Sequence, residues 1–314
     1  MPLVSVIMTS YNYGRYIAQA IESVLFQTFT DFELIVIDDG SDDDSREIIE
    51  RYGRRDPRVK SVFHRSNEGA AYTYNEGIAL SRGKFVAFLD SDDLWAGDKL
   101  EKQLDILKNN ENLVVWSEGE IIDKNGAPTG KTFTSLHKAT GRRKTGRIFD
   151  ELVKGNFIFV SSTIFKKDNL QGVLFGSGVN HMIDFPVYLD LSRRHDFHFI
   201  EEPLAKYRIH GGNITLKDPE AWNSDALLIN GYILSKYGAE LDNRMISKLM
   251  CYSGMSYSKE GNYRRSFECL CAGIRARPLN AYYLLVLPIS VTKFRLRRSL
   301  ANWRATHQPT ADAS

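Results

Sequence analysis

An unbroken apolar run that ends in acid constrains the fold more than any other part of the sequence. Phe85–Leu89 is apolar throughout, and Asp90, Asp92 and Asp93 follow it at once. Such a run predicts a strand that is buried on both faces. Carboxylates this close repel one another unless a cation lies among them, and Mg²⁺ and Mn²⁺ prefer oxygen ligands and often accompany a phosphate. The segment favours a divalent ion that carries a diphosphate and is held by Asp90 and Asp92, although alone it also fits a solvated acidic turn.

Strand-like and helix-like segments alternate through the first part of the chain. Apolar and β-branched residues predict four strands, at Leu3–Met8, Phe32–Ile37, Val59–His64 and Phe85–Leu89. Between them apolar residues recur at helical spacing, and Ser41 with Asp44 predicts a shortened capping box for the second helix. This order is typical of right-handed βαβ crossovers and predicts an α/β fold with a mainly parallel sheet.

Polar residues stand where each of these strands ends. They are Thr9 and Tyr11, then Asp38 and Asp39, then Asn67, then Asp90 and Asp92. In a parallel sheet ligands bind beyond the carboxyl ends of the strands, so we expect these side chains to converge. The first strand is followed by neither a dinucleotide-binding glycine fingerprint nor a Walker-type phosphate loop. A metal ion must therefore do more of the work of holding the phosphates.

Five short segments resemble, in order and spacing, the motifs of the family 2 glycosyltransferases of the GT-A fold. They are Val4–Asn12, Asp38–Ser41, Asn67–Gly69, Asn75–Ile78 and Leu89–Asp93. The match covers roughly the first two thirds of the chain. The resemblance implies a GT-A type mixed, mainly parallel sheet flanked by helices. It also implies an inverting transfer of a sugar from a nucleoside diphosphate, usually UDP, to a hydroxyl acceptor, with Mn²⁺ or Mg²⁺ as cofactor.

The same resemblance assigns the donor site. Tyr11 would pack on the base and Asp39 would accept a hydrogen bond from its N–H, while Asp90 and Asp92 form the DxD motif that touches the ribose and the metal. The nucleotide-binding residues that it implies are Thr9, Tyr11, Asp39, Asn67, Asp90 and Ser91. The metal ligands that it implies are Asp90, Asp92 and His210, with a structural or phosphate-contacting role as the alternative for the histidine.

An inverting displacement also needs a carboxylate that takes the proton of the acceptor hydroxyl as the new bond forms. In the family this is the Asp of a Glu-Asp pair at the start of a helix, and Asp184 stands in that place. Ile183 replaces the usual Glu, and Tyr74 occupies a position where many members have Arg. A helix N-cap is the alternative role for Asp184. The spacing to the segment Glu202–His210 matches the family and favours the catalytic base.

The second half of the chain changes in character. After Trp95 the pattern predicts antiparallel strands. The basic segment 131–147 fits either a solvated mobile loop or a lid or contact for an anionic acceptor. From about Pro219 the chain reads as helical, with one tetratricopeptide-like hairpin. Segment 282–304 is basic and amphipathic, which fits either an anionic membrane surface or a helix packed on the main domain.

We therefore expect three parts with different structures. They are a GT-A domain at 1–215, with a nucleotide-binding half at 1–95 and an acceptor half at 96–215, a helical C-terminal region at 216–305 and a disordered tail at 306–314.

Bulk properties narrow the partners and the location. The formal net charge of +2 gives no argument for nucleic acid. The three cysteines have no CxxC spacing, so neither a disulfide framework nor a zinc site is indicated. The first strand begins almost at once, which leaves no room for a signal peptide, and no apolar run reaches the length of a membrane span. We expect a cytoplasmic protein, with peripheral contact to the inner face of the cell membrane through segment 282–304 as a further option.

The sequence thus predicts a metal-dependent inverting glycosyltransferase. It would move a sugar from a UDP-sugar to a glycan or a lipid-linked sugar in bacterial-type surface polysaccharide, lipopolysaccharide or other glycan biosynthesis. A single helical repeat cannot bury its own face, so contact with a second copy of the chain is also expected as an option. One rival is a sugar-nucleotide-binding scaffold without turnover. Another is a nucleotidyltransferase, which would be expected to carry a glycine-rich phosphate loop that the sequence lacks.

Overall fold

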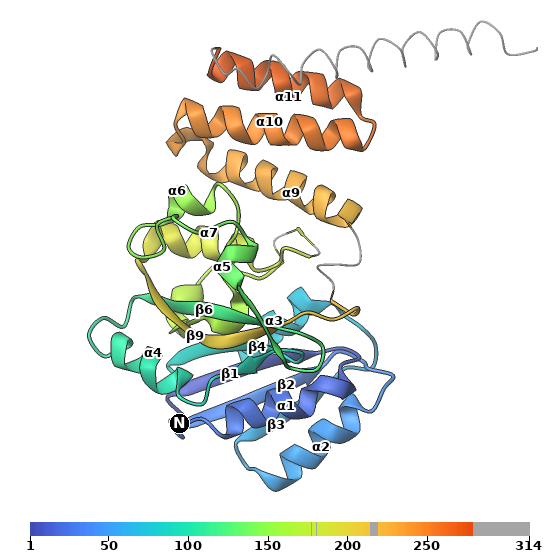
Figure 1. The fold of residues 1–314 in the computed structure, drawn as a ribbon, viewed down its shortest axis with the longest axis vertical. Coiled ribbons are helices and arrows are strands. Elements are labelled where there is room, and N and C mark those ends of the chain that lie inside the picture. The colour runs from blue at the N-terminus through green and yellow to red at the C-terminus, as the bar shows by residue number, and fades with distance from the viewer. Residues whose placement is uncertain (177, 180, 214–218, 279–314) are drawn as a thin grey trace, which may run out of the picture. The chain divides into compact units, whose positions relative to one another are not determined.

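The computed structural model describes residues 1–176, 178–179, 181–213 and 219–278. The chain divides into two compact units, Met1–Asp218 and Pro219–Ser314. The first unit contains the sheet, and the second is helical over its described residues (Figure 1).

One mixed sheet forms the centre of the first unit. Its strands are β1 (Val4–Ser10), β2 (Phe32–Asp38), β3 (Val59–Phe63), β4 (Phe85–Asp90), β5 (Leu94–Trp95), β6 (Val114–Ile122), β7 (Pro128–Thr132), β8 (Ile164–Lys166) and β9 (Phe197–Arg208). Over the described residues they run in the order β3-β2-β1-β4-β8-β6-β9-β5, with β7 paired to β6. Strands β3, β2, β1 and β4 are parallel, and β8 is antiparallel to both β4 and β6. The predicted mixed, mainly parallel sheet flanked by helices is confirmed.

Helices cover both faces of the parallel strands (Figure 1). Over the described residues, the helices of the first unit are α1 (Gly14–Leu25), α2 (Ser45–Arg55), α3 (Ala70–Leu80), α4 (Lys99–Leu107), α5 (Phe133–Leu136), α6 (Phe149–Leu152) and α7 (Phe185–Arg194), with short 3-10 turns η1 (Val160–Ser162) and η2 (Lys167–Leu170). On one face Met8 of β1 shares a core with Ile17 and Ile21 of α1. On the other face α3 packs so closely that a Cβ at Gly77 would lie 2.4 Å from Cγ2 of Ile7. Because successive residues of β1 point to opposite covered faces, the strand is buried almost throughout.

The second helix begins later than the sequence predicts. Asp44 holds the N-cap position of α2, so the predicted capping box with Ser41 is wrong. The Ser41 hydroxyl instead donates to Oδ1 of Asp38 at 2.5 Å and accepts from the Asn12 amide at 2.9 Å. Ser41 therefore joins the loops after β1 and β2 rather than starting a helix.

The basic segment 131–147 is held by the fold. Nη2 of Arg142 donates to the backbone carbonyls of Glu151 and Gly155, the latter at 3.0 Å. Nζ of Lys144 donates to the Thr134 hydroxyl at 3.3 Å, in contact with the ring of Phe199. These side chains already have partners within the first unit, which weighs against a freely moving lid.

The second unit is a set of helices. They are α9 (Pro219–Tyr237), α10 (Asn243–Lys259) and α11 (Tyr263–Ala276), with a 3-10 turn η3 (Gly238–Glu240). Asp242 and Asn262 cap α10 and α11 by accepting from the third helical amide of each. A Cβ at Gly254 would lie 2.8 Å from Cγ of Leu270, so the α10–α11 hairpin depends on a glycine at the contact. Segment 282–304 and the tail 306–314 lie outside the described residues.

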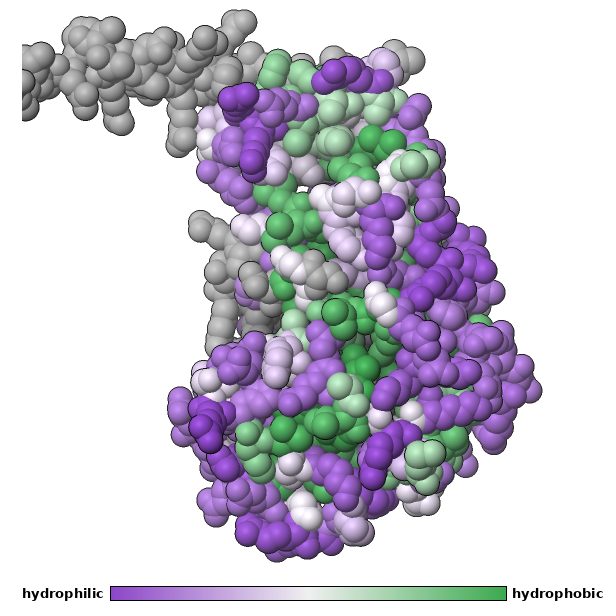
Figure 2. Space-filling view, turned by 180° about the vertical axis from the view of Figure 1, so that it is seen from behind, coloured by the Kyte–Doolittle hydropathy of each residue, from purple (hydrophilic) through white to green (hydrophobic). Residues whose placement is uncertain are grey.

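The surface carries hydrophobic residues between larger hydrophilic areas (Figure 2). Leu174 of the first unit and Tyr252 of the second are among the exposed large apolar side chains. Scattered exposure of this kind is ordinary for soluble domains and does not mark a docking site. Among the residues that the structure describes, no helix combines the length and the apolarity that a bilayer span requires.

Candidate active site

Three neighbouring parallel strands bring the predicted donor residues together. In the register of β1, Thr9 lies opposite Asp90 of β4, and Ser10 lies opposite Asp38 of β2. Asp39 follows β2 directly, so Thr9, Asp39 and Asp90 meet at the carboxyl edge of the sheet. This is the edge at which open α/β sheets bind their ligands.

Three other predicted nucleotide-binding residues differ in their accessibility. Tyr11, in the loop after β1, is 42% exposed, which leaves its ring open to a planar ligand. Asn67, in the loop after β3, is also exposed. Ser91 is only 1% exposed, and its hydroxyl has no hydrogen-bond partner among the described residues. The structure therefore presents Tyr11 and Asn67 to solvent but keeps the Ser91 side chain inside.

The loops after β1 and β2 are bound to each other. Asn12 adopts a positive φ of 58°, and its Oδ1 accepts from the Asp42 amide at 2.9 Å. Oδ2 of Asp43 accepts from the amide of Gly14, the first residue of α1, at 2.8 Å. A Cβ at Gly14 would lie 1.7 Å from Oδ1 of Asp44, so any larger residue there would displace the Asp44 carboxylate. These bonds hold the two loops that carry Tyr11 and Asp39 as one rigid edge.

The Asp39 carboxylate is held from three directions. Its Oδ1 accepts from Nδ1 of His64 at 2.6 Å and from the Glu68 amide at 2.9 Å, and its Oδ2 accepts from the Gly69 amide at 2.9 Å. A carboxylate offers about four acceptor positions. One position, on Oδ2, is therefore left for a donor outside this set.

Asp90 lies between a tyrosine and other carboxylates. The Tyr74 hydroxyl donates to Oδ1 of Asp90, and Thr9 in turn hydrogen-bonds Tyr74. Burial, followed by the charges of Asp92 and Asp184, raises the pKa of Asp90 to about 7, against the lowering effect of the Tyr74 hydrogen bond. The acidic groups at this edge are thus close enough to oppose one another's ionisation.

The chemistry of this edge fits a hard divalent cation. Asp90 and Asp92 supply carboxylate oxygens, and the repulsion between them is the kind that a bound cation relieves. The described residues contain no preformed group of three or more His, Cys, Asp or Glu side chains arranged as a metal site. The ligand sphere of an ion here would therefore need oxygens from the substrate, as is usual for Mg²⁺.

His210 is oriented toward Asp92 by its own turn. The Gly212 amide donates to Nδ1 of His210 at 3.0 Å, so the ring proton sits on Nε2 and is directed at Oδ2 of Asp92, 3.0 Å away. Nδ2 of Asn213 lies 3.4 Å from the same oxygen. A metal-binding histidine usually donates its other ring N–H to an acceptor, whereas Nδ1 here faces a donor. The turn therefore favours His210 as a group that orients Asp92.

Arg208 supports the acidic loop, which is the segment Asp90–Asp93 at the end of β4, through buried hydrogen bonds. It is 1% exposed, its Nε donates to the carbonyl of Asp92 at 2.7 Å, and its Nη2 donates to Oε1 of Gln19 at 2.9 Å. Its amide donates to Oδ1 of Asp93 at 3.0 Å, and the Ser161 hydroxyl donates to Oδ2 of Asp93 at 2.8 Å. Asp93 thus faces inward, where burial raises its pKa well above the usual range, and it has a structural role. The sequence analysis missed Arg208 because nothing nearby in the sequence indicates its partners.

Replacing Arg208 by methionine is expected to lower the free energy of unfolding by about 3 kcal/mol, because it orphans buried acceptors while keeping most of the apolar volume. Urea denaturation measures this difference. Arg54→Met, at a side chain that is 70% exposed, should change stability by less than about 0.5 kcal/mol. Equal stability of the two variants would contradict a supporting role for Arg208.

Asp184 stands at the start of α7 without capping it. It occupies the N-cap position, but its side chain makes no capping hydrogen bond. Instead Nδ2 of Asn156 donates to Oδ2 of Asp184 at 3.1 Å, and Oδ1 of Asn156 accepts from the Ile158 amide at 3.0 Å. Burial raises the pKa of Asp184 to about 6, against the lowering effects of its own amide and the Asn156 hydrogen bond. Asn156 was absent from the predicted site, and it fixes the orientation of this carboxyl group.

Tyr13 is a third residue, after Arg208 and Asn156, that the sequence analysis did not single out. Burial, and then the charges of Asp92, Asp90 and Asp93, raise the pKa of its phenol strongly. Its ring lies 5.6 Å from that of His210 in an edge-on arrangement. Tyr13 therefore remains a neutral hydroxyl close to the acidic loop.

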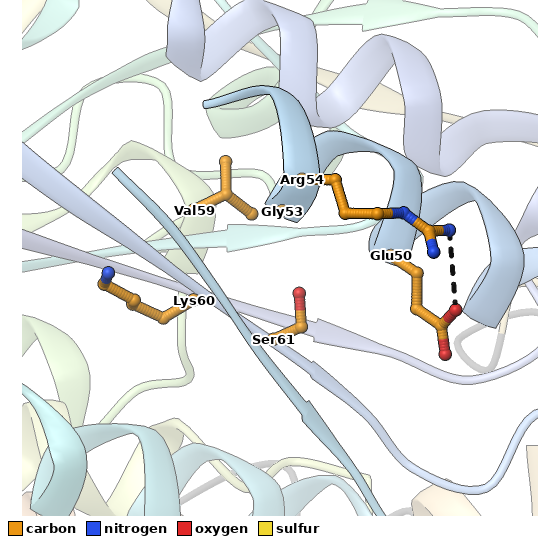
Figure 3. A pocket seen from close by; sticks show the side chains of 6 residues that line it. All are labelled: Glu50, Gly53, Arg54, Val59, Lys60 and Ser61. Atoms are coloured by element: carbon orange, nitrogen blue, oxygen red, sulfur yellow. Dashed lines mark ion pairs between the residues drawn. The ribbon is translucent and has the colours of Figure 1, made fainter. Parts of the chain in front are cut away.

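A separate cavity of about 370 Å³ lies between α2 and β3 (Figure 3). It is lined by Glu50, Gly53, Arg54, Val59, Lys60 and Ser61. The last three are the first residues of β3, at the opposite end of the strand from the acidic edge. Its charged pair, Glu50 and Arg54, is already matched at 3.7 Å. This hollow is no part of the candidate site.

The chain is similar to proteins of one family. The model of "Glycosyl transferase family 2" matches residues 5–171. A glycosyltransferase of Rickettsia bellii is 34% identical over 232 residues, which cover 74% of this chain and 32% of that protein. The chain thus spans about a third of the length of the Rickettsia relatives that it matches first. WfgD of Escherichia coli, named as a UDP-Glc:α-D-GlcNAc-diphosphoundecaprenol β-1,3-glucosyltransferase, is 31% identical over 227 residues, covering 65% of this chain and 89% of WfgD.

Among solved structures, S. aureus TarS 1–349 in complex with UDP-GlcNAc shares the fold. Its TM-score is 0.63 at 20% sequence identity, with 88% of this chain and 81% of that chain covered. At this identity the likeness concerns the fold alone.

Proposed function

Because this chain belongs to glycosyl transferase family 2, we propose that it transfers a sugar from a UDP-sugar to a hydroxyl acceptor with inversion at the anomeric carbon. The observation that carries the proposal is the convergence of Asp39, Asp90, Asp92 and Asp184, which come from three separate segments of the chain. The charge of Asp184 acts on Asp90, so the expected base faces the expected donor site. A scaffold that only binds the nucleotide would use Asp39, Asp90 and Asp92 but would have no use for Asp184.

The nucleoside half of the donor would lie over the loops after β1 and β2. The open acceptor position of Asp39 matches the imide N–H of uracil, and the exposed ring of Tyr11 offers a stacking surface. Thr9 and Asn67 border the same edge. The printed name of WfgD specifies UDP-Glc, and TarS has been crystallised with UDP-GlcNAc, which supports a uridine nucleotide here.

Asp90 and Asp92 would hold Mn²⁺ or Mg²⁺, with His210 orienting Asp92 or joining the ligands. When bound, such an ion neutralises charge on the diphosphate as it leaves. The chain's own residues do the rest of the positioning. Arg208 and Asp93 fix the backbone of the acidic loop, and Tyr74 fixes Asp90.

Asp184 would act as the general base. The acceptor oxygen forms a bond to the anomeric carbon while the bond from that carbon to the diphosphate oxygen breaks, and the hydroxyl proton passes to Asp184. Asn156 donates to Oδ2 of Asp184, and the acceptor hydroxyl would approach the other oxygen, Oδ1. A single displacement of this kind inverts the configuration and forms no covalent enzyme intermediate.

The acceptor would be a growing surface glycan or a lipid-linked sugar, since the name of WfgD specifies a diphosphoundecaprenol-linked GlcNAc. The proposed domains of this enzyme are a GT-A domain at 1–215 and a helical region at 216–305. We also propose that the protein acts at the inner face of the cell membrane, which segment 282–304 would contact. A second copy of the chain is a further proposed partner.

Product analysis tests the proposal. With Mn²⁺ and a GlcNAc-diphospholipid acceptor, a screen of UDP-glucose, UDP-galactose, UDP-GlcNAc and GDP-mannose should release free UDP from at least one donor and no pyrophosphate. Released pyrophosphate would instead indicate nucleotidyl transfer. Tight UDP binding without release of UDP from any donor would favour the scaffold.

A further inference from the structure

His64 links the proposed nucleobase acceptor to a second carboxylate. It follows β3 directly, and because Phe63 pairs with Asp38 in the parallel register, His64 and Asp39 leave neighbouring strands side by side. The His64 amide donates to the carbonyl of Asp38 at 2.9 Å, which fixes its backbone. Its ring then lies between Asp39 and Glu76 of α3, with Nδ1 2.6 Å from Oδ1 of Asp39 and Nε2 2.7 Å from Oε2 of Glu76.

Two ionised carboxylates can only accept hydrogen bonds, so both ring nitrogens must carry a proton for both contacts to exist. A neutral imidazole has one donor and would turn a lone pair toward one of the two carboxylates. The groups acting on the ring come from two elements. They are Asp39 after β2, Glu76 of α3, and the edge-on ring of Tyr72 of α3 at 5.6 Å. Burial lowers the pKa of His64, but the hydrogen bonds and charges of Asp39 and Glu76 outweigh it, and the net shift is upward.

We propose that His64 is a positioning residue for nucleotide recognition. Its doubly protonated ring, braced by Glu76, holds Oδ1 of Asp39 so that Oδ2 keeps one acceptor position open for the imide N–H of uracil. UDP affinity then depends on the protonation of a side chain that does not touch the nucleotide. This inference rests on the proposed function, because it takes Asp39 as the acceptor for the base.

The sign of the pH effect follows from the geometry. As pH rises through the raised pKa of His64, the ring loses a proton and one carboxylate loses its donor. If Nε2 stays protonated and donates to Glu76, the lone pair of Nδ1 faces Oδ1 of Asp39 and repels it. The Asp39 carboxylate would then rotate away from the orientation that binds UDP. UDP binding is therefore expected to weaken on the alkaline side. The uracil imide also loses its proton at alkaline pH, but that contribution is the same for every variant.

The test is calorimetric titration of UDP with Mn²⁺ between pH 6 and 9.5. Glu76→Gln removes a charge from the far side of the ring and should move the midpoint of the affinity loss down by about one pH unit, with near-normal affinity at pH 6. His64→Gln, whose single NH₂ group cannot reach both of the carboxylates that the two ring nitrogens contact, should weaken UDP binding about tenfold at pH 6. Glu101→Gln, at an exposed glutamate of α4 outside the proposed site, is the matched control and should leave both values unchanged.

A second readout reports the ring itself. The His64 signal in NMR spectra, identified by its loss in His64→Gln, should titrate at lower pH in Glu76→Gln than in the wild type. A purely structural role for His64 would change thermal stability without moving a pH midpoint. Equal midpoints in the wild type and Glu76→Gln would overturn the inference.

Asp39→Asn separates this inference from the proposed function. If Asp39→Asn binds UDP as well as the wild type does, the donor-site proposal fails and the inference with it. If Asp39→Asn loses UDP while His64→Gln and Glu76→Gln behave like the wild type, only the role of His64 is overturned.

Discussion

Replacing Asp184 by asparagine is expected to lower kcat about a thousandfold while leaving UDP affinity unchanged. The amide keeps the size and one acceptor oxygen of the carboxyl group but cannot take the acceptor proton, and general base catalysis contributes about 10²- to 10⁴-fold. Asn156 would still hold residue 184 in place, so the variant tests the chemistry rather than the fold. Initial rates of UDP release give kcat, and calorimetric titration gives the UDP affinity.

The matched control is Asp150→Asn, at an exposed acid in the first turn of α6. It should retain full activity.

The wild-type rate should also depend on pH in a defined direction, because burial raises the pKa of Asp184 to about 6 and the base works only when ionised. We expect kcat/KM to fall tenfold per unit as pH drops below about 6, and to level off above it. A loss of less than tenfold in Asp184→Asn would place the base elsewhere.

The convergence of side chains at the carboxyl edge of the sheet could be predicted because these residues are encoded locally. Each apolar run ends in polar residues, and parallel strands bring their carboxyl ends to one edge, so Thr9, Asp39 and Asp90 had to converge once the βαβ order was recognised. The sequence also indicates Asp184 through the resemblance of its surroundings. What these predictions share is that strand type and chain order alone fix the position of the side chain.

The supporting residues could not be predicted, because their partners lie far away in the sequence. Arg208 contacts Asp92 across 116 residues, Asn156 contacts Asp184 across 28, and His64 bridges Asp39 and Glu76 from between them. An arginine or an asparagine near a strand has many ordinary roles, and no spacing separates these from surface residues. Ser41 shows the opposite error, in which a local sequence pattern predicted a contact that does not form. The pattern indicated a helix cap, but the Ser41 hydroxyl hydrogen-bonds Asp38 and the Asn12 amide and joins two loops instead.

Replacing Asp92 by alanine is expected to abolish the part of UDP binding that requires a divalent ion. Asp92 is one of two carboxylates at the proposed ion site, and its loss removes an oxygen ligand and the partner of His210. An ion held there would neutralise charge on the diphosphate of UDP, so we expect UDP affinity with Mn²⁺ to fall at least about a hundredfold, to the level of the wild type with EDTA. Calorimetric titration of UDP into each protein, once with Mn²⁺ and once with EDTA, measures the two affinities.

Two further variants give this result its meaning. Asp105→Ala, at a side chain that is 61% exposed on α4, should bind UDP like the wild type. His210→Ala separates the two roles of the histidine. As a ligand, its loss would match that of Asp92→Ala. As the donor that orients Asp92, which the Gly212 contact favours, its loss should cost about tenfold and leave binding responsive to Mn²⁺. If instead Asp92→Ala binds UDP equally well with Mn²⁺ and shows the wild-type difference between Mn²⁺ and EDTA, the ion lies away from this edge. The role of Asp90 would then have to be explained by the nucleotide alone.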